Sequence, residues 1–154
     1  MIRRARLSDL QQILPLWQEL MAFHMRRSGP MLALAPDAEK KWRAFAKKNI
    51  RSPNGLVLVA EIDGEIVGYS LNFIKNNVPV YRVRRLGHMS DLFVKEAHRG
   101  MGISSAFRKE AFAWFRKRGM RYASIVVHAI NPDAKRIYRG WGFAEQHIEM
   151  RRRL

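Results

Sequence analysis

The sequence predicts a mixed α/β fold in which helices cover a single central sheet. Strand-like and helix-like segments alternate along all 154 residues. The stretch 87–130 reads strand, glycine-containing turn, helix, strand, and the right-handed crossover that this order implies makes its two strands parallel. Asp63 and Gly64, between two apolar segments, are typical of a hairpin turn that joins antiparallel strands. The sheet is therefore expected to be mixed and mostly antiparallel.

Local signals assign the elements of the N-terminal half. Residues 2–6 are expected to form a short strand. Ser8 with Gln11 matches a capping box, so a helix with an apolar face should begin there. Asp37 is expected to cap a second helix that carries apolar side chains on one side and lysines on the other. The two strands of the hairpin are expected over residues 56–62 and 66–74.

The C-terminal half is predicted to hold the parallel pair of strands. A strand over residues 87–94 leads through the glycine turn into a helix from about 102 to 118. A strand over 122–130 follows, and Asn131 then caps a short helix. A last strand is expected over residues 144–153.

Length and composition predict one soluble domain over residues 1–154. Apolar residues make up 47% of the chain, enough for an ordinary core. No apolar run reaches the roughly eighteen residues of a membrane span, and the start lacks the apolar stretch of a signal peptide. Cysteine is absent, which excludes disulfides, a thiol nucleophile and cysteine-ligated zinc. The expected location is the cytoplasm, with no membrane partner.

The chain is strongly basic. Its 29 lysines and arginines against 13 acidic residues give a formal net charge of +16. Such an excess attracts polyanions, whether nucleic acid, an acidic protein or a phosphate-rich cofactor. The sequence carries no zinc-finger, RNP or leucine-zipper pattern. A basic surface without dedicated nucleic-acid binding is the preferred interpretation, and nucleic acid stays an open alternative.

A glycine-containing turn is the first candidate binding segment. Residues 99–104 read Arg-Gly-Met-Gly-Ile-Ser, between a predicted strand and a predicted helix. The two glycines let a ligand approach the backbone without meeting a Cβ atom. The helix start presents unpaired N–H groups and a partial positive charge. The turn therefore predicts an anion site suited to a pyrophosphate, although it matches neither the dinucleotide-binding G-x-G-x-x-G pattern nor a P-loop.

This turn and a second motif together resemble the GNAT N-acetyltransferase superfamily. The pattern R-x-x-G-x-(small) follows the strand segment Asp91-Leu92-Phe93-Val94. Residues 131–143, NPDAKRIYRGWGF, resemble the family's second motif, N-x-x-A-x-x-x-Y-x-x-x-G-F, in the family's order and separation. With the N-terminal strand, helices and hairpin, the resemblance covers nearly the whole chain. Ser104 departs from the pattern, since the family usually has glycine or alanine there.

The resemblance implies acetyl-CoA as cosubstrate, bound where two parallel strands, ending near Val94 and Val127, splay apart. The backbone of Leu92, Phe93 and Val94 would pair with the pantetheine arm. Arg99 and Lys135 would add positive charge, Asn131 would hold the cofactor or position its helix, and no metal is implied. The amides that would hold the pyrophosphate are those of Arg99, Gly100, Met101, Gly102, Ile103, Ser104 and Ser105.

Tyr138 is the first predicted catalytic residue. It occupies the family's tyrosine position in the second motif. The resemblance implies that its phenol donates a proton to the coenzyme A thiolate as it leaves, which is general-acid catalysis. Outside the motif, a lone tyrosine would be interpreted as a half-buried core residue.

Asp91 is the second predicted catalytic residue. It precedes the pantetheine segment, where relatives often place an acidic pair, and Ser90 stands at the first position of that pair. Regular strand alternation places Asp91 on one face with Met89 and Phe93, and His88 on the opposite face. An apolar setting there would make Asp91 a better base for the acceptor amine. Binding of the substrate ammonium, or a structural role, is an equal alternative.

The leading functional hypothesis is transfer of an acetyl group from acetyl-CoA to a primary amine by direct attack in a ternary complex, because no cysteine can carry an acyl intermediate. The alternative is a non-catalytic module with a GNAT-like fold that binds CoA or a polyanion. A net charge of +16 repels polycations, so a small neutral molecule or an amine on an acidic protein fits better as acceptor. The residues leave open whether the chain forms a homodimer.

Overall fold

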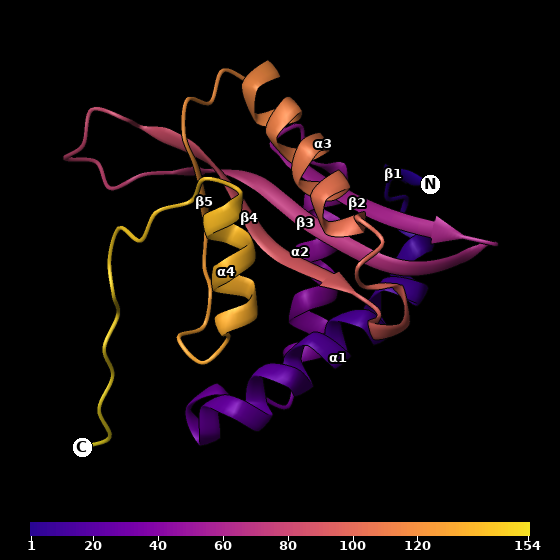
Figure 1. The fold of residues 1–154 in the computed structure, drawn as a ribbon, viewed down its shortest axis with the longest axis horizontal. Coiled ribbons are helices and arrows are strands. Elements are labelled where there is room, and N and C mark those ends of the chain that lie inside the picture. Colours follow the sequence, from indigo (N-terminus) through magenta and orange to yellow (C-terminus); the bar gives the residue numbers. More distant parts are fainter.

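The computed structural model contains one central sheet with helices on both faces (Figure 1). It describes residues 1–28 and 30–154 in full, and for Gly29 the backbone alone. Short 3-10 turns cover Leu7–Asp9, Gly29–Leu32 and Glu96–His98. The main elements are β1 (Ile2–Arg4), α1 (Leu10–Ser28), α2 (Ala38–Arg51), β2 (Gly55–Ile62), β3 (Glu65–Asn76), β4 (Arg85–Val94), α3 (Ile103–Lys117), β5 (Ala123–Ile125) and α4 (Pro132–Gly140).

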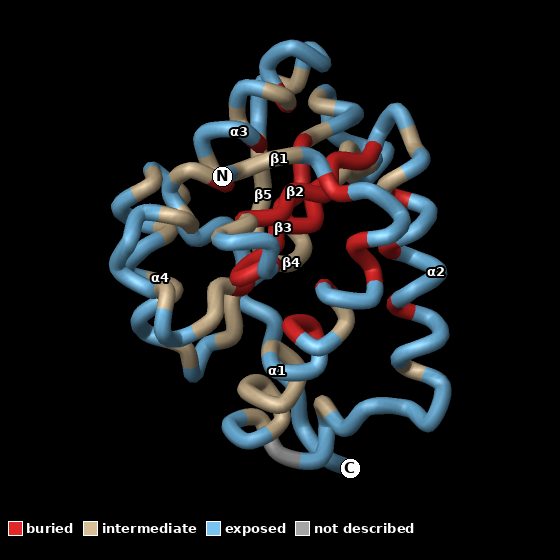
Figure 2. Tube along the Cα trace, turned by 90° about the vertical axis from the view of Figure 1, so that its right-hand side faces the viewer, coloured by how far each residue is buried: buried red, intermediate tan, exposed pale blue. Residues whose placement is uncertain are grey.

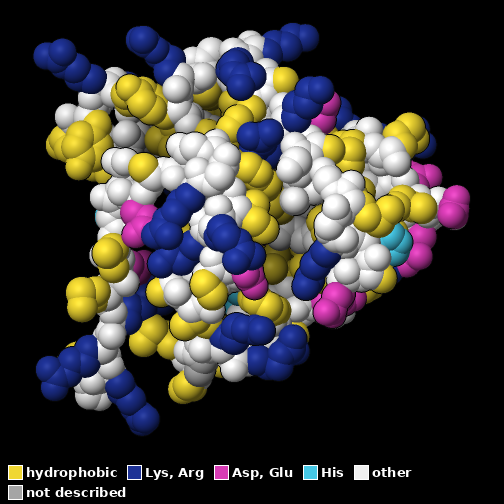
Figure 3. Space-filling model, viewed as in Figure 1, with side chains coloured by type: hydrophobic (Ala, Val, Ile, Leu, Met, Phe, Trp, Pro, Cys, Tyr) yellow, Lys and Arg dark blue, Asp and Glu magenta, His cyan; other side chains and the backbone are white. Residues whose placement is uncertain are grey.

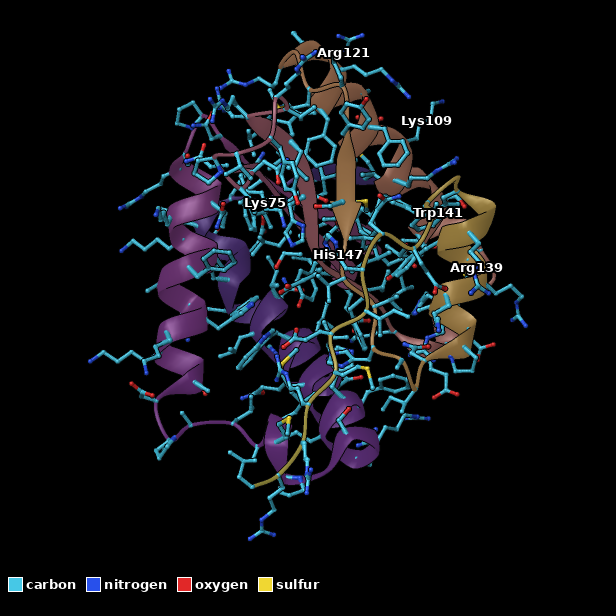
Figure 4. The ribbon with its side chains drawn as sticks, turned by 90° about the vertical axis from the view of Figure 1, so that its left-hand side faces the viewer. Lys75, Lys109, Arg121, Arg139, Trp141 and His147 are labelled. Atoms are coloured by element: carbon cyan, nitrogen blue, oxygen red, sulfur yellow. The ribbon has the colours of Figure 1, made fainter. Side chains whose placement is uncertain are left out.

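The sheet has the mixed and mostly antiparallel character that the sequence predicts. Its strand order is β1-β2-β3-β4-β5. The first three pairings are antiparallel, and β4 pairs with β5 in parallel. Helices α1 and α2 cover one face, and α3 and α4 the other (Figures 1 and 4). Asp63 and Gly64 both have positive φ, as a two-residue hairpin turn between β2 and β3 requires. The predicted fold class is confirmed.

The core fills both sides of the sheet, and Figure 2 shows its buried residues concentrated in the central strands. On the α1/α2 side, Trp17 stacks on Trp42 with ring centroids 5.1 Å apart. On the α3 side, Phe107 and Phe115 are buried against the strands. A Cβ atom at Gly87 would lie 2.5 Å from the Phe115 ring, so only glycine lets α3 approach β4 this closely.

Helix α1 begins differently from the prediction. It starts at Leu10, after the 3-10 turn Leu7–Asp9, and Asp9 rather than Ser8 makes the capping contact of that turn: its carboxylate accepts a hydrogen bond of 2.6 Å from the amide of Arg6. The same carboxylate binds the Arg3 guanidinium through two hydrogen bonds of 2.7 and 3.0 Å. A charged acceptor makes stronger hydrogen bonds than a serine hydroxyl, which explains why Asp9 takes the capping position.

The C-terminal part has less strand than predicted. Only Ala123–Ile125 of the expected strand over 122–130 pairs with β4. The expected strand over 144–153 does not form, and all residues from 144 to 154 are exposed. Ile148 and Met150 keep 79% and 90% of their surface accessible, so this tail has no buried apolar face to hold it in register. Glu145 forms ion pairs with Arg139 and Lys135, which tie the start of the tail to α4.

Within the residues that the structure describes in full, no helix is both long enough and apolar enough to cross a membrane.

Candidate active site

Strand β4 carries a β-bulge in its middle. Leu71 of β3 lies opposite Asp91, but the next residue, Asn72, lies opposite Met89, so Ser90 has no partner in β3. One extra residue in a strand reverses the side to which the following side chains point. The bulge therefore divides β4 into two halves with opposite alternation.

The bulge corrects the predicted facing of the β4 side chains. Met89 is buried with Phe115 on the α3 side, and does not share a face with Asp91. His88 packs edge-on against Phe73 on the α1/α2 side, with ring centroids 5.1 Å apart. His88, Asp91 and Phe93 therefore lie on one face, where regular alternation had placed His88 opposite the other two.

Asp91 accepts hydrogen bonds from three different side chains. Trp42 on α2 donates its indole N–H at 3.0 Å, and Tyr69 on β3 donates its hydroxyl at 3.1 Å, both to Oδ2. Ser90 donates its hydroxyl to Oδ1 at 2.9 Å. Burial and the adjacent Asp91 raise the pKa of Tyr69 well above its usual value, which keeps the phenol protonated as a donor. The carboxylate is thus held in a fixed orientation beneath the two tryptophans of the α1/α2 side.

His88 connects the two parallel strands. Its Nδ1 lies 2.8 Å from the hydroxyl of Ser124 on β5. Burial lowers the pKa of His88 to about 4, so the ring is neutral at physiological pH. Sequence reasoning assigned it no role because the bulge that turns it toward Asp91 has no clear sequence signal.

Beyond this contact, β4 and β5 separate. Their parallel pairing spans only three rungs, Gly87–Ala123, His88–Ser124 and Met89–Ile125. From Asp91 to Val94, β4 pairs with β3 alone within the described part of the chain. The backbone of Leu92, Phe93 and Val94 is therefore at an open strand edge. An open edge of this kind is suited to pair with an extended, amide-containing ligand.

The glycine turn lies at the end of this open edge. Gly100 and Gly102 have φ angles of 78° and 79°, and a Cβ atom at either would meet nothing within 4 Å. Helix α3 begins at Ile103 without a side-chain cap at Gly102, so its first amides are available to an anion. Arg99 is less free than expected, since its Nε donates to the carbonyl of Val94 at 3.1 Å. The turn has the geometry of a phosphate cradle, with Ser104 and Ser105 in the first turn of the helix.

Asn131 and Lys135 belong to the start of α4. The Asn131 side chain accepts a hydrogen bond from the amide of Ala134 at 3.1 Å, which is an N-cap. This contact matches the positioning alternative of the two roles considered for Asn131. The Lys135 ammonium lies 4.0 Å from the carboxylate of Glu145, so its charge is partly balanced within the protein.

Tyr138 packs in an aromatic cluster that holds α4 to α3. Its ring centroid lies 5.4 Å from that of Trp141 and 6.4 Å from that of Phe143, which contacts Phe112 on α3. Burial raises the pKa of Tyr138, so its phenol is protonated at neutral pH. Tyr138 lies on the α3/α4 side of the sheet and Asp91 on the α1/α2 side.

Arg108 is a candidate that sequence reasoning missed. Its guanidinium lies 5.6 Å from the ring centroid of Trp141 and 5.9 Å from that of Phe112. Its Nε is buried and finds no hydrogen-bond partner among residues 1–28 and 30–154. The signal was helix spacing: Ser104, Arg108 and Phe112 follow one another four residues apart, so one stripe of α3 runs from the glycine turn to α4.

A second histidine contact joins α1 to the segment after β5. The rings of His24 and His128 have centroids 4.2 Å apart. Burial and the adjacent His128 lower the pKa of His24 to about 4. This contact brings the end of α1 against the chain that leaves the sheet at Ile125.

Two cavities lie among the described residues, and one of them borders the glycine turn. The larger, about 280 Å³, is lined by β1, β2 and α3, and the smaller, about 150 Å³, borders Met101 and Gly102. Neither is lined by Asp91 or Tyr138. The fully described ranges also contain no cluster of three His, Asp or Glu side chains that could hold a metal ion.

Comparison with known proteins identifies the family. Residues 16–143 match the model of the acetyltransferase (GNAT) family, which is most of the chain. The chain therefore belongs to the GNAT family, and the resemblance seen in its two motifs is confirmed. An uncharacterised N-acetyltransferase of Methanocaldococcus jannaschii is 29% identical over 114 residues, which are 71% of this chain and 49% of that protein. The chain spans about half the length of this and a second archaeal relative.

Solved structures share the fold. The BH1408 protein of Bacillus halodurans, as a tetramutant, superposes with a TM-score of 0.85 at 22% identity, over 100% of this chain and 99% of that one. A predicted acetyltransferase of Clostridium acetobutylicum, solved with acetyl-CoA, gives 0.81 at 14% identity, over 98% and 95%. An aminoglycoside 6'-N-acetyltransferase of Acinetobacter haemolyticus gives 0.75 at 17% identity, over 100% and 99%. At these identities, the likeness concerns the fold. It agrees with the family match over residues 16–143.

Proposed function

We propose that this chain is an acetyl-CoA-dependent N-acetyltransferase that acetylates a primary amine by direct attack within a ternary complex. The observation that carries the proposal is the glycine turn at residues 99–105. Two positive-φ glycines precede an uncapped helix start, directly after a strand whose edge opens at Ser90. A phosphate group at the turn and an amide-containing arm along β4 would occupy one continuous surface. The structure of the Clostridium relative was solved with acetyl-CoA, which supports this choice of cosubstrate.

Different groups of the protein would bind different parts of the cofactor. The amides of residues 99–105 would bind the pyrophosphate, and the backbone of Leu92, Phe93 and Val94 would pair with the pantetheine amides. Arg108 has an unpartnered Nε on the stripe of α3 that begins at Ser104. It would supply a cation to the phosphates in addition to Arg99 and Lys135. Arginine suits this place because its planar fork binds anionic oxygens in pairs.

Tyr138 and Asp91 would act on opposite sides of the transferred group. When bound, acetyl-CoA supplies a thioester whose carbonyl carbon the amine nitrogen attacks, forming a C–N bond and breaking the C–S bond. Tyr138 would give its phenol proton to the sulfur, and burial, which raises its pKa, keeps that proton on the phenol until the thiolate leaves. Asp91, on the α1/α2 side, would receive the amine: as a base it takes the proton, or as a fixed carboxylate it binds the ammonium, which then gives its proton to water before the neutral amine attacks.

The acceptor is proposed to be a small molecule that carries a primary amine. The Acinetobacter relative is named an aminoglycoside acetyltransferase, which supports a small acceptor in this fold. The net charge of +16 disfavours acceptors with several positive charges. A small, weakly charged amine satisfies both considerations, and the proposed setting of this reaction is the cytoplasm.

The experiment is a thiol-release assay with acetyl-CoA and a panel of primary amines, with wild-type protein and the Asp91→Asn variant. We expect one acetylated amine for each free thiol. Asp91→Asn should lower kcat if Asp91 is the base, and should raise the acceptor KM if it binds the ammonium. Binding of acetyl-CoA without thiol release by any amine would overturn the proposal and leave the non-catalytic binding module.

A further inference from the structure

Three loops meet at the end of the sheet that lies opposite the glycine turn. They are the α2–β2, β3–β4 and α3–β5 connections (Figure 1). In the α2–β2 connection, the backbone carbonyl of Asn54 accepts a hydrogen bond from the amide of Ile74 on β3. In the α3–β5 connection, the backbone carbonyl of Tyr122 accepts a hydrogen bond of 3.0 Å from the amide of Gly87 on β4. These contacts fix the three loops as one surface. We name it the arginine end, formed by Arg82, Arg84, Arg85, Arg118 and Arg121 with Tyr81 and Tyr122.

The arginine end has no acidic residue to balance it. The segments that build it, 44–60, 66–90 and 111–132, contain no aspartate or glutamate. None of the ion pairs formed by the described residues involves any of its five arginines. All five are exposed. Figure 3 shows Lys and Arg side chains along this corner of the molecule, and Figure 4 shows Arg121 at its tip.

Two of these arginines share a neutral acceptor. Arg85 and Arg118 each donate through Nη2 to the side-chain oxygen of Asn54, at 3.2 and 2.9 Å. The two guanidinium groups repel each other because both are positively charged and both donate to the same neutral amide oxygen. A carboxylate at the position of Asn54 would have offset this repulsion. A bridging phosphate would do the same from solution. The arrangement therefore presents an anion site with two guanidinium forks already oriented.

Exposed aromatic rings lie beside these charges. Tyr81 and Tyr122 keep 58% and 61% of their surface accessible, and each is adjacent in sequence to an arginine of the surface. Arginine forks bind phosphates, and exposed aromatic rings stack on unpaired bases. An acidic protein would use the charges but would leave the rings without a matching group.

We propose that the arginine end binds single-stranded nucleic acid, with the arginines on the phosphates and the two tyrosines stacked on bases. The sequence alone favoured a basic surface without this role, because it shows no nucleic-acid-binding motif. The contacts through Asn54 and Tyr122 bring together residues that are distant in sequence. The proposal is independent of acetyl transfer and does not require acetyl-CoA.

The test measures binding of labelled oligo(U) RNA and oligo(dT) DNA of about twenty nucleotides to the full chain by fluorescence anisotropy, at two salt concentrations. Removing three cations by Arg82→Gln, Arg85→Gln and Arg118→Gln should weaken binding by about tenfold to a hundredfold and lower the salt slope by about two. The matched control is Lys40→Gln, Lys41→Gln and Arg43→Gln, which has the same net charge and lies at the far end of α2. It should change affinity less than about threefold.

Stacking is tested separately. Tyr81→Ala with Tyr122→Ala should weaken binding about tenfold or more, and the corresponding pair of Phe variants should retain it. Photocrosslinking of 4-thiouridine RNA to the wild-type chain should label peptides that contain these tyrosines, which needs no variant to fold. Equal affinity for RNA and DNA would indicate recognition through phosphates and bases alone. A preference for RNA would indicate that the surface also contacts the 2'-hydroxyl.

Three results would overturn the proposal. The first is no binding at low salt, and the second is equal loss in the arginine variant and its control. The third is displacement of the oligonucleotide by polyglutamate at equal charge, which would assign the surface to an acidic protein.

Discussion

Asp9 shows how one charged side chain joins three parts of the N-terminal region. Its carboxylate binds the Arg3 guanidinium and the Arg6 amide, while Arg3 also contacts Glu61 on β2. The hydrogen bond from Arg3 is the main reason that the pKa of Asp9 lies below its ordinary value of 3.8. A carboxyl with a lowered pKa stabilises the fold above the ordinary value, and this stabilisation is lost as the pH falls through the folded value.

Asp9→Asn should therefore lower the free energy of unfolding by about 1–3 kcal/mol at pH 7. The gap between wild type and variant should begin to close as the pH falls below the ordinary value of 3.8, where the unfolded chain takes up the proton first, and should be lost as the pH falls through the lower folded value. Urea unfolding at pH 7 and pH 3 measures both values. An equal gap at the two pH values would show that the charge of Asp9 contributes nothing.

Tyr138→Phe tests the proposed general acid. The ring keeps its contacts with Trp141 and Phe143, and only the proton donor is removed. We expect kcat to fall on the order of a hundredfold with little change in the acetyl-CoA KM. Steady-state kinetics with the best amine of the panel measure this. Unchanged turnover, with the chemical step shown to limit the rate, would make Tyr138 a packing residue.

At the scale of elements, the glycine turn gives the sharpest prediction. Gly102→Asn should raise the acetyl-CoA KM about tenfold or more, since a side chain enters the proposed phosphate cradle. Asparagine tolerates positive φ, so the fold should persist. The matched control is Gly119→Asn at the end of α3, where φ is 78° and a Cβ atom also meets nothing within 4 Å. Both variants should unfold at similar temperatures, and a similar KM in both would remove the turn from the cofactor site.

Elements set by local signals could be predicted from the sequence, and features set by strand pairing could not. Asn131 caps α4 as expected, because an N-cap needs only residues next to it in the chain. The bulge at Ser90 depends on the pairing register of β4 with β3, and no residue type in the sequence predicts it. The bulge reversed the expected facing of Met89 and His88, so that His88 lies on the same face of the sheet as Asp91. The predicted cofactor segments depend less on this facing, because the proposed contacts use backbone groups, and they stay a prediction.

At the scale of the whole molecule, the C-terminal tail is the largest departure from expectation. A strand requires a partner edge and an apolar face, and residues 144–154 are exposed throughout. Removing residues 146–154 should therefore change the free energy of unfolding by less than about 1 kcal/mol. Thermal unfolding of full-length and shortened chains measures this. A large drop in the melting temperature would show that the tail completes the sheet, either within one chain or across a homodimer. Formation of a homodimer stays a prediction.

The central claim is that acetyl-CoA binds along the open edge of β4 and at the turn that follows it. Amide hydrogen exchange, measured with and without acetyl-CoA, tests this claim without any variant. We predict slower exchange at residues 92–94 and 99–105, with β1 and the residue 63–64 turn unchanged. Slower exchange confined to another part of the molecule, or none at saturating acetyl-CoA, would contradict the site and the function built on it.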